Sequence, residues 1–146
     1  MSQVFTEVIH ALLTEAFEGS SEVWFSDRNT GLFSSLQDLS AEQVSKTGIA
    51  AHTNHLRWSL SKVNAMMRGE RPAPAMDWAQ SWTLKTVAEL EWQTLLEQLK
   101  LEYQFLQTHM PANPDLNDRM FVTSGVALVA HAAYHLGAIR QMMLIQ

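Results

Sequence analysis

The sequence predicts an all-α protein, a four-helix bundle with long crossover connections. Apolar residues recur at intervals of three and four over four long segments. No segment alternates between apolar and polar residues as a half-buried strand does. With 146 residues, 47% hydrophobic and 17% charged, the chain can bury one core, and we expect residues 1–146 to form a single domain.

The first helix is expected at roughly residues 3–17, with Gly19 as a stop just beyond it. Residues 18–40 then form a long connection that carries Trp24 and Phe25. Long connections are usually either functional or disordered, and because this one carries aromatic residues, we expect it to be packed and functional.

The second helix is expected to begin at a capping box, Ser40 with Gln43, and to end near Gly69. Its apolar residues recur at helical spacing, at Ile49, Leu56, Leu60, Val63 and Met67. A second long connection follows at 70–83, with two prolines and two tryptophans, Pro72, Pro74, Trp78 and Trp82.

The third helix is expected at roughly 84–109, where the segment containing Pro111 breaks it. The fourth runs from about 120 to the end of the sequence. Since two of the connections are long, the helices should be joined by at least one crossover and not only by tight hairpins.

Composition narrows the function classes. The formal charge of −5 and the lack of a basic cluster interleaved with aromatics argue against nucleic acid as a partner. Without cysteine there are no disulfides and no thiolate ligands. The N-terminus lacks the pattern of a signal peptide, and His131, His135 and Arg140 interrupt the longest apolar stretch. We therefore expect a cytoplasmic protein that does not span a membrane.

His131 and His135 are the most informative residues. Four residues apart in a helix, their side chains share one face, so both rings can reach one ion at about 2.0–2.1 Å. The surrounding sequence is apolar, and burying a histidine is costly unless its ring nitrogens find partners. We predict a metal ion between them. The alternative is that the two rings hydrogen-bond to Tyr134, Tyr103 or a buried water, with no ion.

A third ligand should come from a facing helix, from His10, His52, His55 or His109. His109 is expected at an exposed helix end, and His10 belongs to a lone Glu-x-x-His motif where a di-iron site needs two. On a helical wheel His52 lies within roughly 45° of the centre of the apolar stripe, and His55 about 105° away. We predict His52 as the third ligand and His55 as a neighbouring pocket residue, with the reverse assignment left open.

Three neutral imidazoles suit a divalent transition metal such as Zn²⁺, Ni²⁺, Fe²⁺ or Cu²⁺ and are poor ligands for Mg²⁺ or Ca²⁺. They leave a coordination position open for water or substrate, as catalytic sites do. An ion held in this way would lower the pKa of a bound water or thiol and so supply a nucleophile.

The segment His-Ala-Ala-Tyr-His-Leu-Gly-Ala-Ile-Arg-Gln at 131–141 resembles the last helix of the DinB-like (DNA-damage-inducible, YfiT-like) metalloprotein superfamily. The stretches 24–42 and 51–57 are similar to that family too, so the resemblance covers most of the chain. It implies a four-helix bundle, usually a homodimer, that holds a divalent ion. It also implies a third metal-binding histidine on the second helix, roughly where His52 and His55 stand.

Two hypotheses of function follow from the predicted site and from this resemblance. Some members are metal-dependent transferases or isomerases that use a low-molecular-weight thiol, and a hydrolase is a further possibility for such a site. The other expectation is a non-catalytic dimeric helical module whose metal, if bound, is structural. Besides the predicted ligands, Tyr134, His55 and Arg140 are candidates for the catalytic site, although Arg140 could instead pair with Glu89 or Glu91. The resemblance identifies neither substrate nor thiol.

Overall fold

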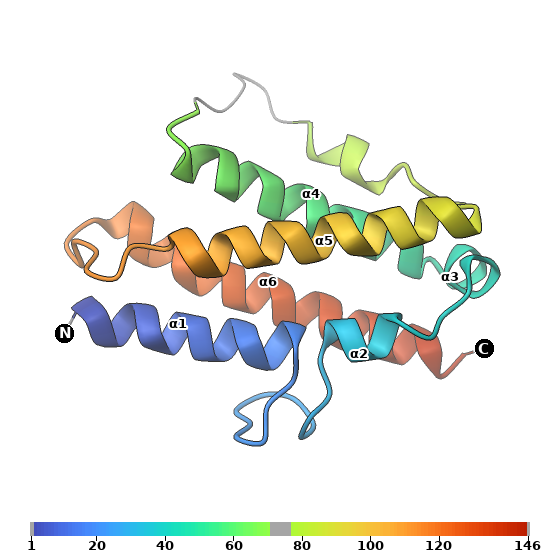
Figure 1. Cartoon of the computed structure of the whole chain (residues 1–146), viewed down its shortest axis with the longest axis horizontal. Helices are drawn as coiled ribbons and strands as arrows, with labels where there is room; N and C mark the ends of the chain where they lie inside the picture. Colours follow the sequence, from blue (N-terminus) through green and yellow to red (C-terminus); the bar gives the residue numbers. More distant parts are fainter. Residues whose placement is uncertain (1, 71–76, 146) are drawn as a thin grey trace. The chain divides into compact units, whose positions relative to one another are not determined.

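The computed structural model of the protein describes residues 2–70 and 77–145, and those residues contain helices and no strand (Figure 1). The predicted all-α class is therefore confirmed for the described residues. The helices are α1 (Ser2–Phe17), α2 (Leu32–Leu36), α3 (Ala41–Thr47), α4 (Ile49–Met67), the short 3₁₀ helix η1 (Trp78–Trp82), α5 (Glu89–His109) and α6 (Arg119–Met143).

The chain divides into two compact units. The first comprises Met1–Gln37 with Met110–Ala138, and the second comprises Asp38–His109 with Ile139–Gln146. Helix α6 thus contributes its longer part to the first unit and its last turn to the second.

In the first unit, α1 packs against the first half of α6. The rings of Phe5 and Phe121 lie 6.1 Å apart. Gly125 permits this approach, because a Cβ atom there would lie only 3.1 Å from the Phe5 ring. At the start of α1, the Thr6 hydroxyl donates a 2.8 Å hydrogen bond to the carbonyl of Pro111. These contacts bind the segment that follows α5 to α1.

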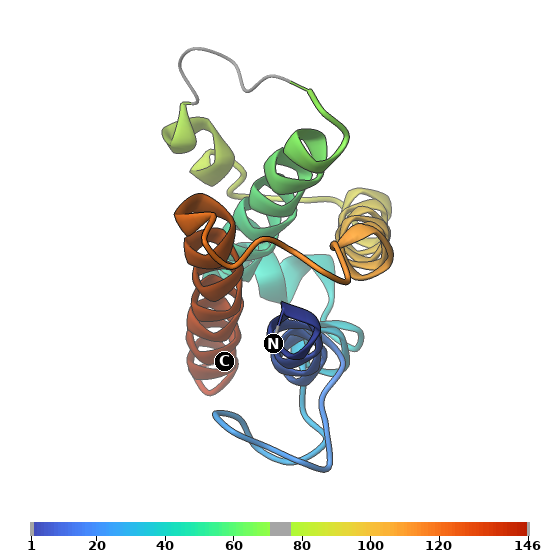
Figure 2. The ribbon, with the colours of Figure 1, turned by 90° about the vertical axis from the view of Figure 1, so that its left-hand side faces the viewer.

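The loop between α1 and α2 is organised by one buried carboxylate, and it projects to one side of α1, at the bottom of Figure 2. Glu15 is only 1% exposed. It accepts hydrogen bonds of 2.8–3.0 Å from the backbone N–H groups of Trp24, Phe25 and Ser26, and another from the Ser26 hydroxyl. Glu15 thus orders this connection through hydrogen bonds, but Trp24 and Phe25 are 80% and 40% exposed, so the two aromatics do not pack as predicted.

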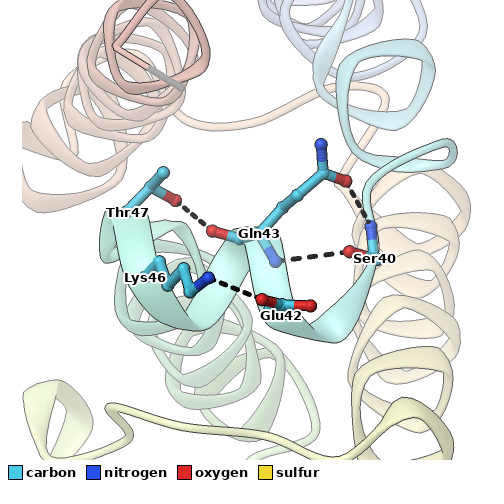
Figure 3. A network of polar contacts seen from close by, with 5 residues as sticks. All are labelled: Ser40, Glu42, Gln43, Lys46 and Thr47. Carbon is cyan, nitrogen blue, oxygen red and sulfur yellow. Dashed lines mark hydrogen bonds and ion pairs between the residues drawn. The ribbon is translucent and has the colours of Figure 1, made fainter.

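The second unit begins at the predicted capping box. Ser40 accepts from the Gln43 backbone N–H, and the Gln43 side chain accepts from the Ser40 N–H (Figure 3). The helix that follows is shorter than expected, because Gly48 adopts a left-handed conformation with φ of +84°. One expected helix is therefore two, α3 and α4, and the second ends at Met67 as predicted near Gly69.

Helices α4 and α5 lie side by side and run in the same direction (Figures 1 and 2). A parallel pair needs a long connection, so the predicted crossover is present between them. Asn64 of α4 is fully buried and donates to both the carbonyl and the carboxylate of Glu102 on α5. The Trp92 indole, also fully buried, donates to the carbonyl of Leu39 and so fixes α5 to the start of α3.

Helix α5 starts five residues later than expected, at Glu89. The Val87 N–H donates to the Ser45 hydroxyl, and the Ala88 N–H to the Glu91 carboxylate. One bond comes from a residue outside the helix, Ser45, and the other from its first turn, at Glu91. Together they cap the helix and prevent its extension toward residue 84. Helices α2 and η1 were not expected, and Pro72 and Pro74 lie outside the described residues.

Helix α6 is long and apolar enough to cross a membrane, judged on length and composition alone. The core helix of a protein in water meets the same two criteria. The expectation that the chain does not span a membrane therefore stays a prediction.

We predict that Glu15→Gln destabilises the protein. Burial raises the pKa of the Glu15 carboxyl, but its hydrogen bonds outweigh this and hold the pKa below its usual value. An amide presents an NH₂ group to donors, which leaves buried N–H groups without an acceptor at about 1–3 kcal/mol. Urea unfolding at neutral pH should show this loss.

The same carboxylate gives the loss a pH dependence. A lowered pKa in the folded state stabilises the fold above the unfolded pKa of about 4.5, and this stability is lost as pH falls through the folded pKa. The difference between wild type and Glu15→Gln should therefore shrink in acid. Glu22→Gln, on the exposed part of the same loop, is the control and should behave as wild type. Equal stability of wild type and Glu15→Gln at neutral pH would contradict the role given to Glu15.

Candidate metal centre

The two histidines of α6 lie ring against ring. Their Nε2 atoms are 3.0 Å apart, and the ring planes are nearly perpendicular. His135 is completely buried and His131 is half-buried. Two imidazole nitrogens bound to one ion at about 2.0–2.1 Å lie roughly 2.9–3.4 Å apart. The pair therefore has the separation that a shared metal ion requires.

The same geometry also describes a hydrogen bond between the rings. A neutral imidazole carries one N–H, so one Nε2 can donate to the other. Of the alternative partners considered from sequence, Tyr134 is 64% exposed and meets His135 through ring contact, with the centroids 5.1 Å apart. The Tyr103 hydroxyl accepts from Gln107. Each α6 ring thus has the other as a partner when no ion is bound.

On α4, His55 is held by the short helix η1. It is 6% exposed, and its Nδ1 lies 2.6 Å from the Ser81 hydroxyl. The indole of Trp82 stacks on the ring, with centroids 4.1 Å apart and planes inclined by 18°. His52, one turn earlier, is half-buried and meets the same indole edge to face at 4.9 Å. Both α4 histidines are therefore ordered by Trp82, but only His55 is hydrogen-bonded to Ser81.

Three histidines, His55, His131 and His135, form a group that could hold a metal ion. Each offers one ring nitrogen, and these atoms all lie within 4.8 Å of one another. The group contains the two predicted α6 ligands and, as its third member, His55. It therefore matches the reverse assignment that the sequence left open, with His55 in the place predicted for His52.

The connection between α4 and α5 explains why His55 is buried although the helical wheel placed it toward the polar face. The wheel placed His55 toward the polar face of α4, which would be exposed on an isolated helix. In the second unit η1 covers that face, with Ser81 buried against His55 and Trp82 stacked on it. Ser81 is thus the site residue that sequence reasoning missed. Its only signal was its place between two tryptophans, Trp78 and Trp82, in a connection too long to be a simple linker.

Burial keeps His131, a member of this group, and His52, which lies outside it, in the neutral form. Desolvation lowers the pKa of His131 and of His52 below the ordinary value of 6.5. Both rings are therefore neutral at physiological pH, and a neutral imidazole has the lone pair that a metal needs.

The remaining candidate residues lie elsewhere or bind other groups. His109 is exposed at the end of α5, as predicted, with its Nδ1 2.9 Å from the Phe105 carbonyl. Arg140 is half-buried on α6. Its two suggested acidic partners have other contacts: Glu89 with Gln93 and the Ala41 N–H, and Glu91 with the Ala88 N–H.

Comparisons with protein-family models, with curated proteins and with solved structures found no match for this chain.

The lowered pKa values predict that the metal-free protein loses stability in mild acid. As pH falls through about 6.5, the unfolded chain takes up protons on these histidines, while the folded chain does so only at lower pH. The unfolded state is therefore favoured progressively until pH passes the folded pKa. Urea unfolding in the presence of a chelator, between about pH 8 and pH 5, measures this slope.

His131→Gln should flatten that slope, because the substituted residue no longer titrates. His109→Gln removes an exposed histidine and is the matched control, for which the slope of the wild type is expected. If His131→Gln and His109→Gln show the same dependence on pH, the burial of His131 does not govern its protonation.

Proposed function

We propose that this protein binds one divalent transition metal ion through His55, His131 and His135 and acts as a metal-dependent enzyme on a small molecule. The observation that carries the proposal is the grouping of three histidine ring nitrogens within 4.8 Å. Zn²⁺, Ni²⁺ and Fe²⁺ are the ions that such a set of neutral nitrogen ligands suits.

The chain's own residues support the ligand role. His131 and His135 already have the separation of two ligands on one ion. His55 is oriented by a hydrogen bond and by a stacked indole. The ion would supply an activated water or thiol in the position that three protein ligands leave open. Tyr134, on the turn of α6 that carries His135, is the neighbouring side chain whose hydroxyl could contact a substrate.

The resemblance of residues 131–141 to the DinB-like superfamily supports the same reading. Under it, the four long helices form a DinB-like four-helix bundle, and the reaction is a transfer or isomerisation with a low-molecular-weight thiol, or a hydrolysis. Homodimers and a cytoplasmic location belong to the same proposal. Outward side chains at the start of α6 are suited to a subunit contact, since Met120 and Val126 are each more than half exposed.

A structural metal is the second candidate, and burial favours it. His135 is completely buried and His55 is 6% exposed, so two of the three proposed ligands offer little surface to a substrate. In this alternative the ion joins the helices and adds to the free energy of folding, as structural metals do.

Metal analysis tests the site in both forms. Purified protein, dialysed after loading with Zn²⁺ or Ni²⁺, should retain one ion per chain. Replacing His55, His131 or His135 by alanine should abolish retention, because two ligands do not make a tight site. His52→Ala is the matched control on α4 and should bind as wild type. Loss of the ion in His52→Ala, with retention in His55→Ala, would falsify the assignment of His55.

Activity separates the two roles of the ion. A catalytic site predicts metal-dependent turnover in a screen of small thiols with electrophiles, together with amide and ester substrates, and its loss in His131→Ala. A structural site predicts no turnover. Both sites predict a rise in unfolding free energy of about 2.7 kcal/mol when free metal reaches about 100 times Kd, so turnover alone separates them. Turnover that persists in the presence of chelator would contradict both.

A further inference from the structure

The Ser81 hydroxyl takes part in two hydrogen bonds but has one proton. It lies 2.6 Å from the carbonyl oxygen of Trp78, which can only accept, so the hydroxyl proton is directed there. It also lies 2.6 Å from Nδ1 of His55. Since its proton is already used, the Ser81 oxygen accepts in this second bond, and Nδ1 of His55 must carry the hydrogen.

A neutral imidazole holds one hydrogen, so with Nδ1 protonated the lone pair lies on Nε2. We infer that Ser81 is a positioning residue that holds His55 in its Nδ1–H tautomer, and so makes Nε2 the metal-binding atom. This inference deepens the proposed function and rests on it for the metal, but the tautomer itself is a property of the metal-free protein.

Ser81 is held firmly enough for this role. It is 1% exposed. Its carbonyl accepts a 2.8 Å hydrogen bond from the Asn54 side chain, whose oxygen accepts in turn from Arg57. Two side chains of α4 therefore hold Ser81 in place: Asn54 bonds the Ser81 backbone carbonyl, and His55 bonds the Ser81 hydroxyl. At the other end of η1, Asp77 caps the helix by accepting from the Ala79 N–H.

The ring of His55 is fixed from a second direction. The neighbouring residue in η1, Trp82, lies flat on it. A hydrogen bond at Nδ1 and a stacked indole together leave the ring one orientation, with its Nε2 edge opposite Ser81. Ligating histidines commonly donate their second ring N–H to such a partner, and loss of the partner weakens metal binding about 10–100-fold. Here the partner is the Ser81 hydroxyl, which donates its own proton to the backbone carbonyl of Trp78.

The tautomer is measured directly by ¹⁵N NMR of the imidazole nitrogens in metal-free protein. Wild type should show His55 with hydrogen on Nδ1. Ser81→Ala should lose this signature, because it removes the hydroxyl oxygen that accepts from Nδ1, and Ser81→Thr, which keeps the hydroxyl, should retain it. Ser59→Ala is the matched control: it removes another buried hydroxyl, one that donates to the backbone carbonyl of His55 and does not bond its ring.

Metal affinity is the second readout. In competition with a chromophoric chelator, Ser81→Ala should bind Zn²⁺ about 10–100-fold more weakly than wild type, with Ser59→Ala and Ser81→Thr close to wild type. Wild-type His55 with hydrogen on Nε2 overturns the inference, whether or not the variants fold. An unchanged Zn²⁺ affinity in Ser81→Ala also overturns it.

The two readouts separate this inference from the proposed function. If wild type binds no ion but His55 carries hydrogen on Nδ1, the proposed function fails and the tautomer assignment stands. If wild type binds an ion through His55 and Ser81→Ala binds it equally well, the proposed function stands and the role of Ser81 fails.

Discussion

A buried imidazole has two ring nitrogens, and each of them must find a partner inside the protein. The parts of the molecule that bear on function follow from this constraint. On α6 the rings of His131 and His135 satisfy each other through Nε2. On α4 the Nδ1 atom of His55 is satisfied by Ser81, and the crossover between α4 and α5 folds into a short helix to bring that hydroxyl into place. A metal ion is the partner that would use the remaining lone pairs of all three rings at once.

The periodic parts of the fold could be predicted from sequence because their signals are local. The stripes of α1 and α6 and the cap at Ser40 depend on residues within a few positions of one another. The errors came from interactions over longer separations. The start of α5 is delayed by a bond from Val87 to Ser45, forty-two residues earlier in the chain. The break at Gly48 depends on its left-handed backbone conformation and not on a close contact, since nothing lies within 4 Å of a Cβ atom placed there. A single glycine in a helical pattern is not enough to predict such a break, because helices tolerate isolated glycines.

In the candidate site, too, the local features could be predicted from sequence and the features that depend on distant residues could not. The spacing of His131 and His135 is sufficient to pair them, because a helix places residues four apart on one face. The burial of His52 and of His55 depends on what covers α4. A wheel weighs only apolar neighbours on the same helix, whereas His55 is buried by Ser81 and Trp82, more than twenty residues away. A polar residue can therefore be buried on the polar face of an amphipathic helix when a connection folds back over it.

The carboxylate of Glu15 has a consequence for the loop that it organises. Three of its four hydrogen bonds come from backbone N–H groups, at Trp24, Phe25 and Ser26. Every amino acid except proline supplies that group. At Trp24 and Phe25 the path of the loop is thus independent of the side chain, so these positions can change by substitution, whereas the Ser26 hydroxyl supplies the fourth hydrogen bond. Variation among related sequences would then be tolerated at 24 and 25 and restricted at positions 15 and 26.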